Sequence, residues 1–244
     1  MQGWYREDLA HIHDAGFSGY ALGAAPGILG ILDQNGISGG LVVDLGCGSG
    51  LWARELVNAR YSVFGIDISE AMIELARRRV PEAEFRAGSL FDADIPPCGA
   101  VTSVGEVLNY RLDPDNGIQR LTRLFRRVYD ALAPGGVFVF DIAEPGQVAR
   151  GTVDRSFAEG EGWVVLVEKE EDAEQETLMR RISTFRKLRK HYRRDDEAHS
   201  LRLYESSEIS GELRQTGFQV RMMRSYGRYR LPKAHASFVA HKPA

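Results

Sequence analysis

From residue 41 to residue 142, short apolar runs alternate with stretches whose apolar side chains recur at helical spacing. We expect strands at 41–45, 61–66, 84–87, 100–104 and 137–141, and helices at 51–59, 70–79 and 118–132. A continuous apolar run such as 41–45 is typical of a parallel strand buried on both faces. The alternation therefore predicts an α/β fold built on a doubly wound parallel sheet.

The pattern changes after residue 147. Segments 163–167, 178–185 and 200–204 are expected to be strands, so 147–204 is predicted to be β-rich. A helix at 207–216, closed by Gly217, and strands at 218–223 and 236–240 complete the chain. Six acidic residues lie between Glu168 and Glu176, and eight basic residues lie between Arg180 and Arg194. Paired antiparallel strands would set these charges opposite one another; a phosphate- or RNA-binding stripe is the alternative.

Composition limits the classes of protein that the chain can represent. With 244 residues, 43% of them hydrophobic and 27% charged, it suits one large domain or a domain with a sizeable insertion. A net charge of −3 favours neither nucleic acid nor an anionic membrane as partner. No apolar run has the roughly 18–20 residues that a membrane-spanning helix needs. A polar N-terminus and only two cysteines predict free thiols and a cytoplasmic location.

Glycines at alternate positions follow the first predicted strand. Asp44 precedes them, and Gly46, Gly48 and Gly50 lead into a helical pattern that begins at Leu51. Glycine allows a backbone to turn with positive φ or to approach a ligand closely, and a helix start presents free N–H groups. Leu51 stands where the dinucleotide pattern G-x-G-x-x-G requires glycine, and no lysine completes a phosphate-binding loop. The turn therefore predicts a nucleoside site of another kind.

The D-x-G-x-G-x-G pattern at 44–50 resembles motif I of the class I S-adenosylmethionine-dependent methyltransferases. Segments 213–220 and 236–242 are similar to this family's last helix, sixth strand and antiparallel terminal strand. The resemblance covers roughly 40–142 and 206–242. It implies a Rossmann-like, seven-stranded, mostly parallel sheet with an antiparallel last strand and a β-rich insertion between strands 5 and 6. The implied domains are an N-terminal helical lid (1–38), the cofactor-binding domain (39–146 and 205–244) and a substrate cap (147–204).

An acid at the carboxyl end of the second strand, Asp67, can accept both ribose hydroxyls of an adenosine. The resemblance places Ile68 against the adenine. In the family an aspartate usually contacts the adenine amine, but Ser89 stands at that position here. Backbone N–H groups of Ser89 and Leu90 are candidate substitutes, and Asp92 is either a replacement acid or part of the loop. The full set of predicted cofactor residues is Asp44, Gly46, Cys47, Gly48, Gly50, Asp67, Ile68, Ser89, Leu90, Gly105 and Glu106.

The acceptor side is defined less sharply. His13, in the predicted lid, and Glu106, just after the fourth strand, are the candidate general bases. Packing of His13 against Tyr5 or Tyr20 is the alternative. We expect His13, Tyr110, Tyr192 and Arg202 to line the acceptor pocket. Cys98 is expected to be a packed thiol, and residues 113–116 a turn, so no metal site is predicted.

The sequence thus predicts transfer of a methyl group from S-adenosylmethionine to an O or N atom of a small-molecule acceptor, which leaves S-adenosylhomocysteine. We expect a monomer or homodimer, with no nucleic-acid or membrane partner. Three other hypotheses remain: a nicotinamide oxidoreductase, a cofactor-binding sensor without catalysis, and a methyltransferase that acts on a macromolecule.

Overall fold

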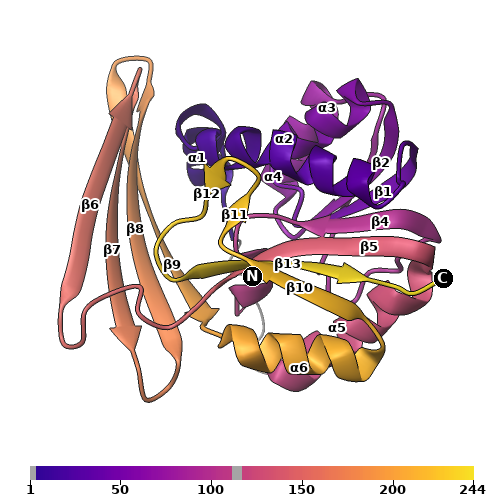
Figure 1. The fold of residues 1–244 in the computed structure, drawn as a ribbon. Helices are drawn as coiled ribbons and strands as arrows, with labels where there is room; N and C mark the ends of the chain where they lie inside the picture. Colours follow the sequence, from indigo (N-terminus) through magenta and orange to yellow (C-terminus); the bar gives the residue numbers. More distant parts are fainter. Residues whose placement is uncertain (1–3, 112–116) are drawn as a thin grey trace.

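A seven-stranded sheet forms the centre of the computed structural model, which describes residues 4–111 and 117–244 (Figure 1). Its strand order is β10-β13-β5-β4-β1-β2-β3, and only β13 runs antiparallel to its neighbours. The expected mixed sheet with an antiparallel last strand is confirmed. The strands are β1 (Gly40–Leu45), β2 (Tyr61–Asp67), β3 (Glu84–Ala87), β4 (Cys98–Ser103), β5 (Leu132–Ala143), β10 (Gln219–Met223) and β13 (His235–His241).

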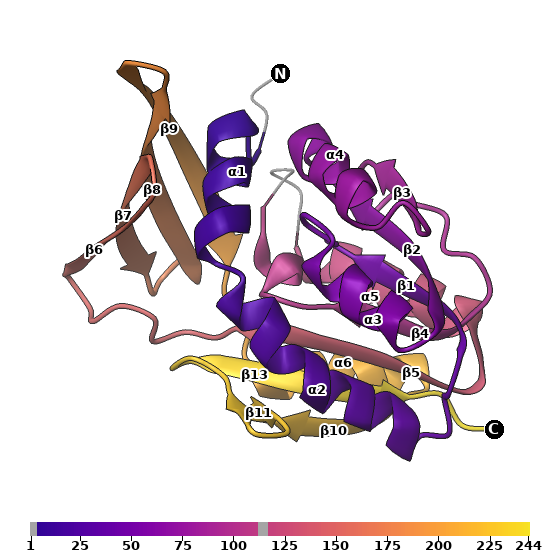
Figure 2. The same cartoon turned by 90° about the horizontal axis from the view of Figure 1, so that it is seen from above.

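Helices cover both faces of this sheet (Figures 1 and 2). On one face lie α2 (Gly19–Gln34), α3 (Leu51–Asn58) and α4 (Glu70–Arg79), and on the other α5 (Ile118–Ala131) and α6 (Ser206–Thr216). The sequence specifies several of the helix ends. The Ser69 hydroxyl accepts a hydrogen bond from the Met72 backbone N–H at the start of α4, and Gly217 takes a left-handed conformation at the end of α6.

The insertion is a separate four-stranded antiparallel sheet of β6 (Val153–Gly160), β7 (Trp163–Asp172), β8 (Thr177–Leu188) and β9 (His191–Arg202). Its acidic and basic strands do pair, as the charge pattern suggested. Arg155 binds Glu168 at 2.7 Å and Arg181 binds Glu170 at 3.0 Å. The strands are longer than the apolar runs predicted, and β6, which is mostly exposed, was not predicted. Charged residues alternate along these strands, so the apolar runs are shorter than the strands themselves.

The first helix, α1 (Glu7–Gly16), lies between the two sheets (Figure 2). Leu9 and Ile12 pack against Trp163, Val165 and Ile182 on the inner face of the insertion. Its other side is fastened to the central domain through Asp14, which accepts hydrogen bonds from Ser49 at 2.5 Å and from Arg79 at 3.0 Å. The N-terminal segment therefore connects the two sheets.

Two further elements were not predicted: the hairpin of β11 (Ser225–Tyr226) and β12 (Tyr229–Arg230), and the short 3-10 helix η1 (Val107–Asn109). The turn expected at 113–116 lies outside the described residues. Within the described residues, no single helix is long and apolar enough to cross a membrane; α1 and α2 pass that test only as a pair bent by 60°.

A buried hydrogen-bonded chain supports the glycine turn from below. The Trp52 indole N–H donates to the Thr102 hydroxyl at 3.0 Å, and that hydroxyl donates to the Asp44 carboxylate at 2.7 Å. Asp44 and Thr102 are register neighbours on β1 and β4. Burial raises the pKa of Asp44 to about 7, although the hydrogen bond from Thr102 opposes the shift. Asp44 therefore anchors the end of β1 from within the core.

We predict that Asp44→Asn alters the pH dependence of stability. Because the pKa of Asp44 is higher in the folded state than in the unfolded state, protonated Asp44 adds to the free energy of unfolding at low pH. The wild-type protein loses this stabilisation as pH rises through the folded-state pKa. The variant carries no such titration, so between pH 5 and pH 8 the wild type should lose on the order of 3 kcal/mol relative to it. Urea unfolding at both pH values measures this difference; parallel pH dependences would contradict it.

Candidate functional site

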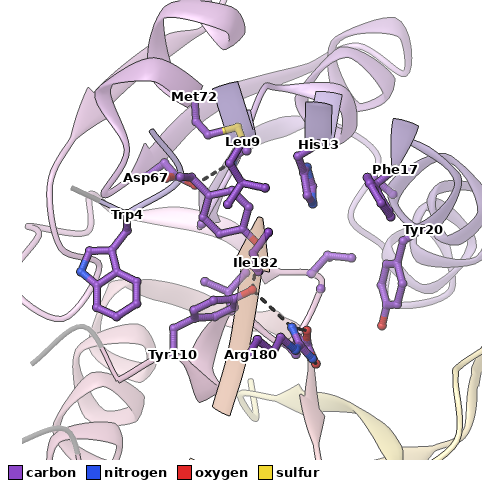
Figure 3. A pocket seen from close by; sticks show the side chains of 18 of the residues that line it. Trp4, Leu9, His13, Phe17, Tyr20, Asp67, Met72, Tyr110, Arg180 and Ile182 are labelled. Atoms are coloured by element: carbon purple, nitrogen blue, oxygen red, sulfur yellow. Dashed lines mark hydrogen bonds and ion pairs between the residues drawn. The ribbon is translucent and has the colours of Figure 1, made fainter. Parts of the chain in front are cut away.

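A cavity of about 810 Å³ lies at the carboxyl ends of the central strands, and α1 and the inner face of the insertion both line it. This is where open α/β sheets bind their ligands. Its lining comes from the N-terminal segment, the loops after β1, β2, β3 and β4, strands β6 to β8, and the loop before β13. In Figure 3 His13, Tyr110 and Arg180, from three different elements, face the same space.

The glycine turn forms one wall of the cavity. Gly46 has φ of 78°, and a Cβ there would lie 2.3 Å from a methyl group of Val107, so no other residue fits. Gly48 also has positive φ, at 52°, but nothing lies within 4 Å of where its Cβ would be. The backbone at Gly48 is thus bare toward the cavity, as close approach of a ligand requires.

Asp67 is fixed beside this turn. Its carboxylate accepts hydrogen bonds from the backbone N–H groups of Gly48 and Ser69, each at 2.9 Å. Burial raises the pKa of Asp67, and these N–H groups oppose the shift. Each carboxylate oxygen has more than one lone-pair direction, so Asp67 retains acceptor capacity toward the cavity that it lines.

A flatter, mostly apolar part of the cavity continues from Asp67. Ile68, Met72 and Leu90 line it, together with Gly88, where no atom lies within 4 Å of the position that a Cβ would take. Ser89 does not line the cavity; its hydroxyl accepts a hydrogen bond from the backbone N–H of Phe91 at 3.2 Å. A planar, apolar group attached to a ribose at Asp67 would therefore lie between Ile68 and Leu90.

Other predicted cofactor residues support the cavity from behind. Asp44, Cys47 and Gly50 do not line it. Cys47 and Cys98 are free, buried thiols, and burial raises the pKa of Cys98 to about 12, as suits a packed side chain. Gly50 is the left-handed residue before α3, where a Cβ would lie 3.1 Å from Ala76. These residues shape the turn and leave contact with a ligand to their neighbours.

The floor of the cavity is held by a carboxylate that the sequence did not single out. Asp141, fully buried at the end of β5, accepts hydrogen bonds from the backbone N–H of Gly105 at 3.0 Å and of Glu106 at 2.6 Å. It also accepts one from the Tyr226 hydroxyl at 2.9 Å. Glu106 has φ of 55°, a strained value for a residue other than glycine. Asp141 holds this strained turn in place.

Glu106 takes part in a buried charge cluster. Both of its carboxylate oxygens are bound by the Arg180 guanidinium, with Nη2 at 2.9 Å, and the His235 ring lies 3.1 Å away. Burial alone would raise the pKa of Glu106, but the attraction of Arg180 and the hydrogen bonds from His235 and Arg180 hold it at about 2. A carboxylate of such low basicity takes up few protons near neutrality. The hypothesis of Glu106 as general base is therefore replaced by a role in positioning Arg180 and His235.

His235 is held in its cationic form. Nδ1 lies 2.9 Å from the Lys233 carbonyl oxygen and Nε2 lies 3.1 Å from Glu106, so both ring nitrogens face hydrogen-bond acceptors. Burial lowers the pKa of His235, but the hydrogen bond and charge of Glu106, with the hydrogen bond to the Lys233 backbone, together outweigh burial and raise the pKa. The three ionised groups Glu106, Arg180 and His235 therefore sum to a positive charge.

His13 has the opposite character. It lines the cavity, its Nδ1 is buried, and among the described residues that atom has no hydrogen-bond partner. Burial lowers the pKa of His13, against the attraction of Asp14 and Glu106. Its ring also packs edge-on against Tyr5 at 5.4 Å between ring centres, so packing and exposure to the cavity coexist. A neutral imidazole with a free nitrogen can accept a proton from a ligand.

Tyr110 lies at the cavity as predicted, paired with Tyr5 from the N-terminal segment through their hydroxyls at 2.7 Å. Two other predicted acceptor residues lie elsewhere. Tyr192 is 57% exposed on β9, where it pairs in register with Lys187, and Arg202 binds Glu176 at 3.1 Å. Neither lines the cavity. The strand pairing of β9 carries both away from it, so they drop out of the candidate site.

Besides Asp141, sequence reasoning missed Arg180 and His235, which line the cavity. A signal for Arg180 was present: Leu178, Arg180 and Ile182 alternate along one strand, so this arginine shares a face with apolar residues. Such a placement indicates a buried, paired guanidinium. His235 directly precedes the buried run of β13, but its partner Glu106 lies 129 positions away, and no local pattern connects the two.

The cavity fits a nucleoside-containing cofactor. Gly48, Gly88 and Gly105 all have positive φ and no neighbour where a Cβ would be, which makes a backbone cradle along one side. Asp67 offers acceptors for a ribose, and buried N–H or nitrogen atoms of Arg180 and His13 are unpartnered among the described residues. Polar atoms buried without partners are uncommon and point to a ligand that completes them.

Comparison with known proteins agrees with this geometry. Residues 42–136 match the family model described as a methyltransferase domain. A putative methyltransferase of Bacillus subtilis, YqeM, is 26% identical over 190 residues, which cover 74% of each protein.

Two solved structures share nearly the whole fold. A S-adenosylmethionine-dependent methyltransferase from Clostridium acetobutylicum has a TM-score of 0.81 at 20% identity and covers 96% of this chain and 98% of its own. The sugar N-methyltransferase KedS8 from a Streptoalloteichus species has a TM-score of 0.77 at 19% identity and covers 100% and 95%. Residues 42–136 thus match a methyltransferase domain, and the fold of the chain is shared with S-adenosylmethionine-dependent methyltransferases.

Proposed function

We propose that the protein transfers the methyl group of S-adenosylmethionine to an O or N atom of a small-molecule acceptor inside this cavity. One observation carries the proposal: Asp67 and the bare backbone of Gly48 line the same cavity as His13, Tyr5 and Tyr110. The donor therefore lies along the glycine turn with its ribose at Asp67. The acceptor lies on the side of the lid and the insertion.

Methyl transfer from this donor requires the protein mainly to position the acceptor relative to the methyl group. S-adenosylmethionine supplies a methyl group on a positively charged sulfur, and in-line displacement needs the acceptor atom close to that carbon and opposite the sulfur. Trp4, Leu9, Phe17 and Ile182 supply apolar walls that keep water out of the reacting space. A concave cavity of this volume favours a small molecule over a macromolecule.

His13 has the properties of a general base for the acceptor. A neutral hydroxyl or an ammonium group must lose a proton to complete the transfer, and His13 stays unprotonated near neutrality because burial lowers its pKa. Its unpartnered Nδ1 is the atom that would take the proton. The structural likeness to a sugar N-methyltransferase makes sugar amines the first acceptor class to test.

A panel of amino sugars, phenols and small carboxylic acids, assayed for S-adenosylhomocysteine formation, tests the proposal. Turnover of any of them separates this enzyme from a sensor that binds cofactor without chemistry. The protein could instead bind S-adenosylhomocysteine, turn over no compound of the panel and methylate RNA or protein in an extract. That result would show that the acceptor is a macromolecule. Binding of a nicotinamide dinucleotide in place of the adenosyl cofactor would contradict it outright.

We predict that Asp67→Asn weakens binding of S-adenosylhomocysteine by about 10- to 100-fold, because charge-assisted hydrogen bonds to the ribose become neutral ones. Isothermal titration calorimetry measures the change. Asp92→Asn is the matched control: it removes the same charge from an acid that is exposed in the loop after β3 and paired with Arg120. Equal affinities of the two variants would refute the role of Asp67.

We predict that His13→Gln lowers kcat by roughly 10²- to 10⁴-fold on an acceptor that must lose a proton, with cofactor affinity unchanged. In the wild type, the rate should fall as pH drops below the ordinary histidine value of about 6.5, because the pKa of His13 is lowered. That acid limb should disappear in the variant. If it persists unchanged with full activity, another group is the base.

A further inference from the structure

The acceptor half of the cavity carries more positive charge than its own carboxylate can offset. Apart from Asp67, which lies at the ribose end, Glu106 is the acidic side chain among its described lining residues. The cationic lining residues are Lys169, Arg180, Lys233 and His235. Glu106 is already shared between Arg180 and His235. Lys169 and Lys233 therefore remain uncompensated.

The position of Lys169 is unusual for a lysine. It pairs in register with Arg180 on the neighbouring strand β8, so both side chains leave the same, inner face of the insertion. Like charges directly opposite across two strands destabilise a sheet. The exposed neighbour on its other side is Asp154, yet no ion pair joins Lys169 to it or to any other described residue. Lys169 and Arg180 are therefore neighbours on one face of the insertion, and only Arg180 is bound by a carboxylate, that of Glu106.

Lys233 reaches the same cavity from a different part of the chain. It lies in the loop before β13, and its carbonyl oxygen is the acceptor that faces the His235 ring. Gln147, another lining residue, donates to the neighbouring Ala234 carbonyl at 2.6 Å and so ties this loop to the segment after β5. The Lys233 ammonium has no ion-pair partner among the described residues. Lys169 and the more exposed Lys233 thus line one cavity from two elements, and neither has an ion-pair partner among the described residues.

The methyl donor makes this excess less favourable still, because its sulfonium adds a further positive charge to the cavity. We propose, on the basis of the function proposed above, that the acceptor carries an anionic group, a phosphate or a carboxylate, which binds Lys169 and Lys233. The nucleophilic atom then lies toward His13 and the glycine turn, and the anion lies beneath the insertion. Charge thus selects the acceptor and fixes which end of it meets the methyl group.

Calorimetry on protein saturated with S-adenosylhomocysteine tests this, with inorganic pyrophosphate and citrate as probes. We expect at least one of them to bind, and Lys169→Gln combined with Lys233→Gln to weaken it by about 10-fold or more. The control, Lys190→Gln, removes a charge from the exposed turn between β8 and β9 and should bind the probe like the wild type. Preference for pyrophosphate assigns a phosphate to the acceptor, and preference for citrate assigns a carboxylate.

Two results would overturn the inference. One is that neither probe binds to the protein loaded with S-adenosylhomocysteine; the other is that the double variant binds the probe as tightly as the control variant. Failure of S-adenosylhomocysteine itself to bind would instead overturn the proposed function. The two ideas therefore fail in different measurements.

Discussion

The buried pair of Glu106 and Arg180 joins the central sheet to the inserted sheet. Glu106 stands on a strained turn at the end of β4, and Arg180 comes from the inserted sheet. The side chains of both are only 13% exposed. Removing Glu106 would leave the buried charge of Arg180 uncompensated, which costs about 3–5 kcal/mol. The pair therefore determines where the insertion lies relative to the central sheet, and with it the shape of the cavity.

Two histidines in the same cavity, His13 and His235, have pKa values that their surroundings shift in opposite directions. Burial without a partner keeps His13 neutral, whereas Glu106 and a carbonyl oxygen keep His235 charged. Groups whose surroundings separate their pKa values in this way take different roles in acid–base chemistry. One histidine is free to accept a proton, and the other contributes fixed charge that orients a ligand.

Local patterns in the sequence were sufficient for the central domain. The apolar runs, the alternate glycines and Asp67 each report their own surroundings, because strand burial and turn geometry depend on neighbouring residues. They predicted the sheet, the glycine turn and the cavity wall at Asp67. The charge cluster could not be predicted in this way, because Glu106, Arg180 and His235 meet only after the insertion folds over the floor. Tyr192 and Arg202 were misplaced for the same reason: composition assigned them to the insertion, but strand register decided which side of it they face.

The N-terminal segment closes the cavity with contacts that span almost the entire chain. The Tyr5 backbone N–H bonds to Glu197, 192 positions later, and the Arg6 side chain binds Asp195, 189 positions later. Pairings this distant carry a large loop-closure entropy and form slowly. The contacts of Asp14 with Ser49 and Arg79 are much closer in sequence, so the two sides of the first helix differ in how far apart in the chain their partners lie. The cavity is therefore complete only once β9 has paired into the inserted sheet and holds the N-terminal segment.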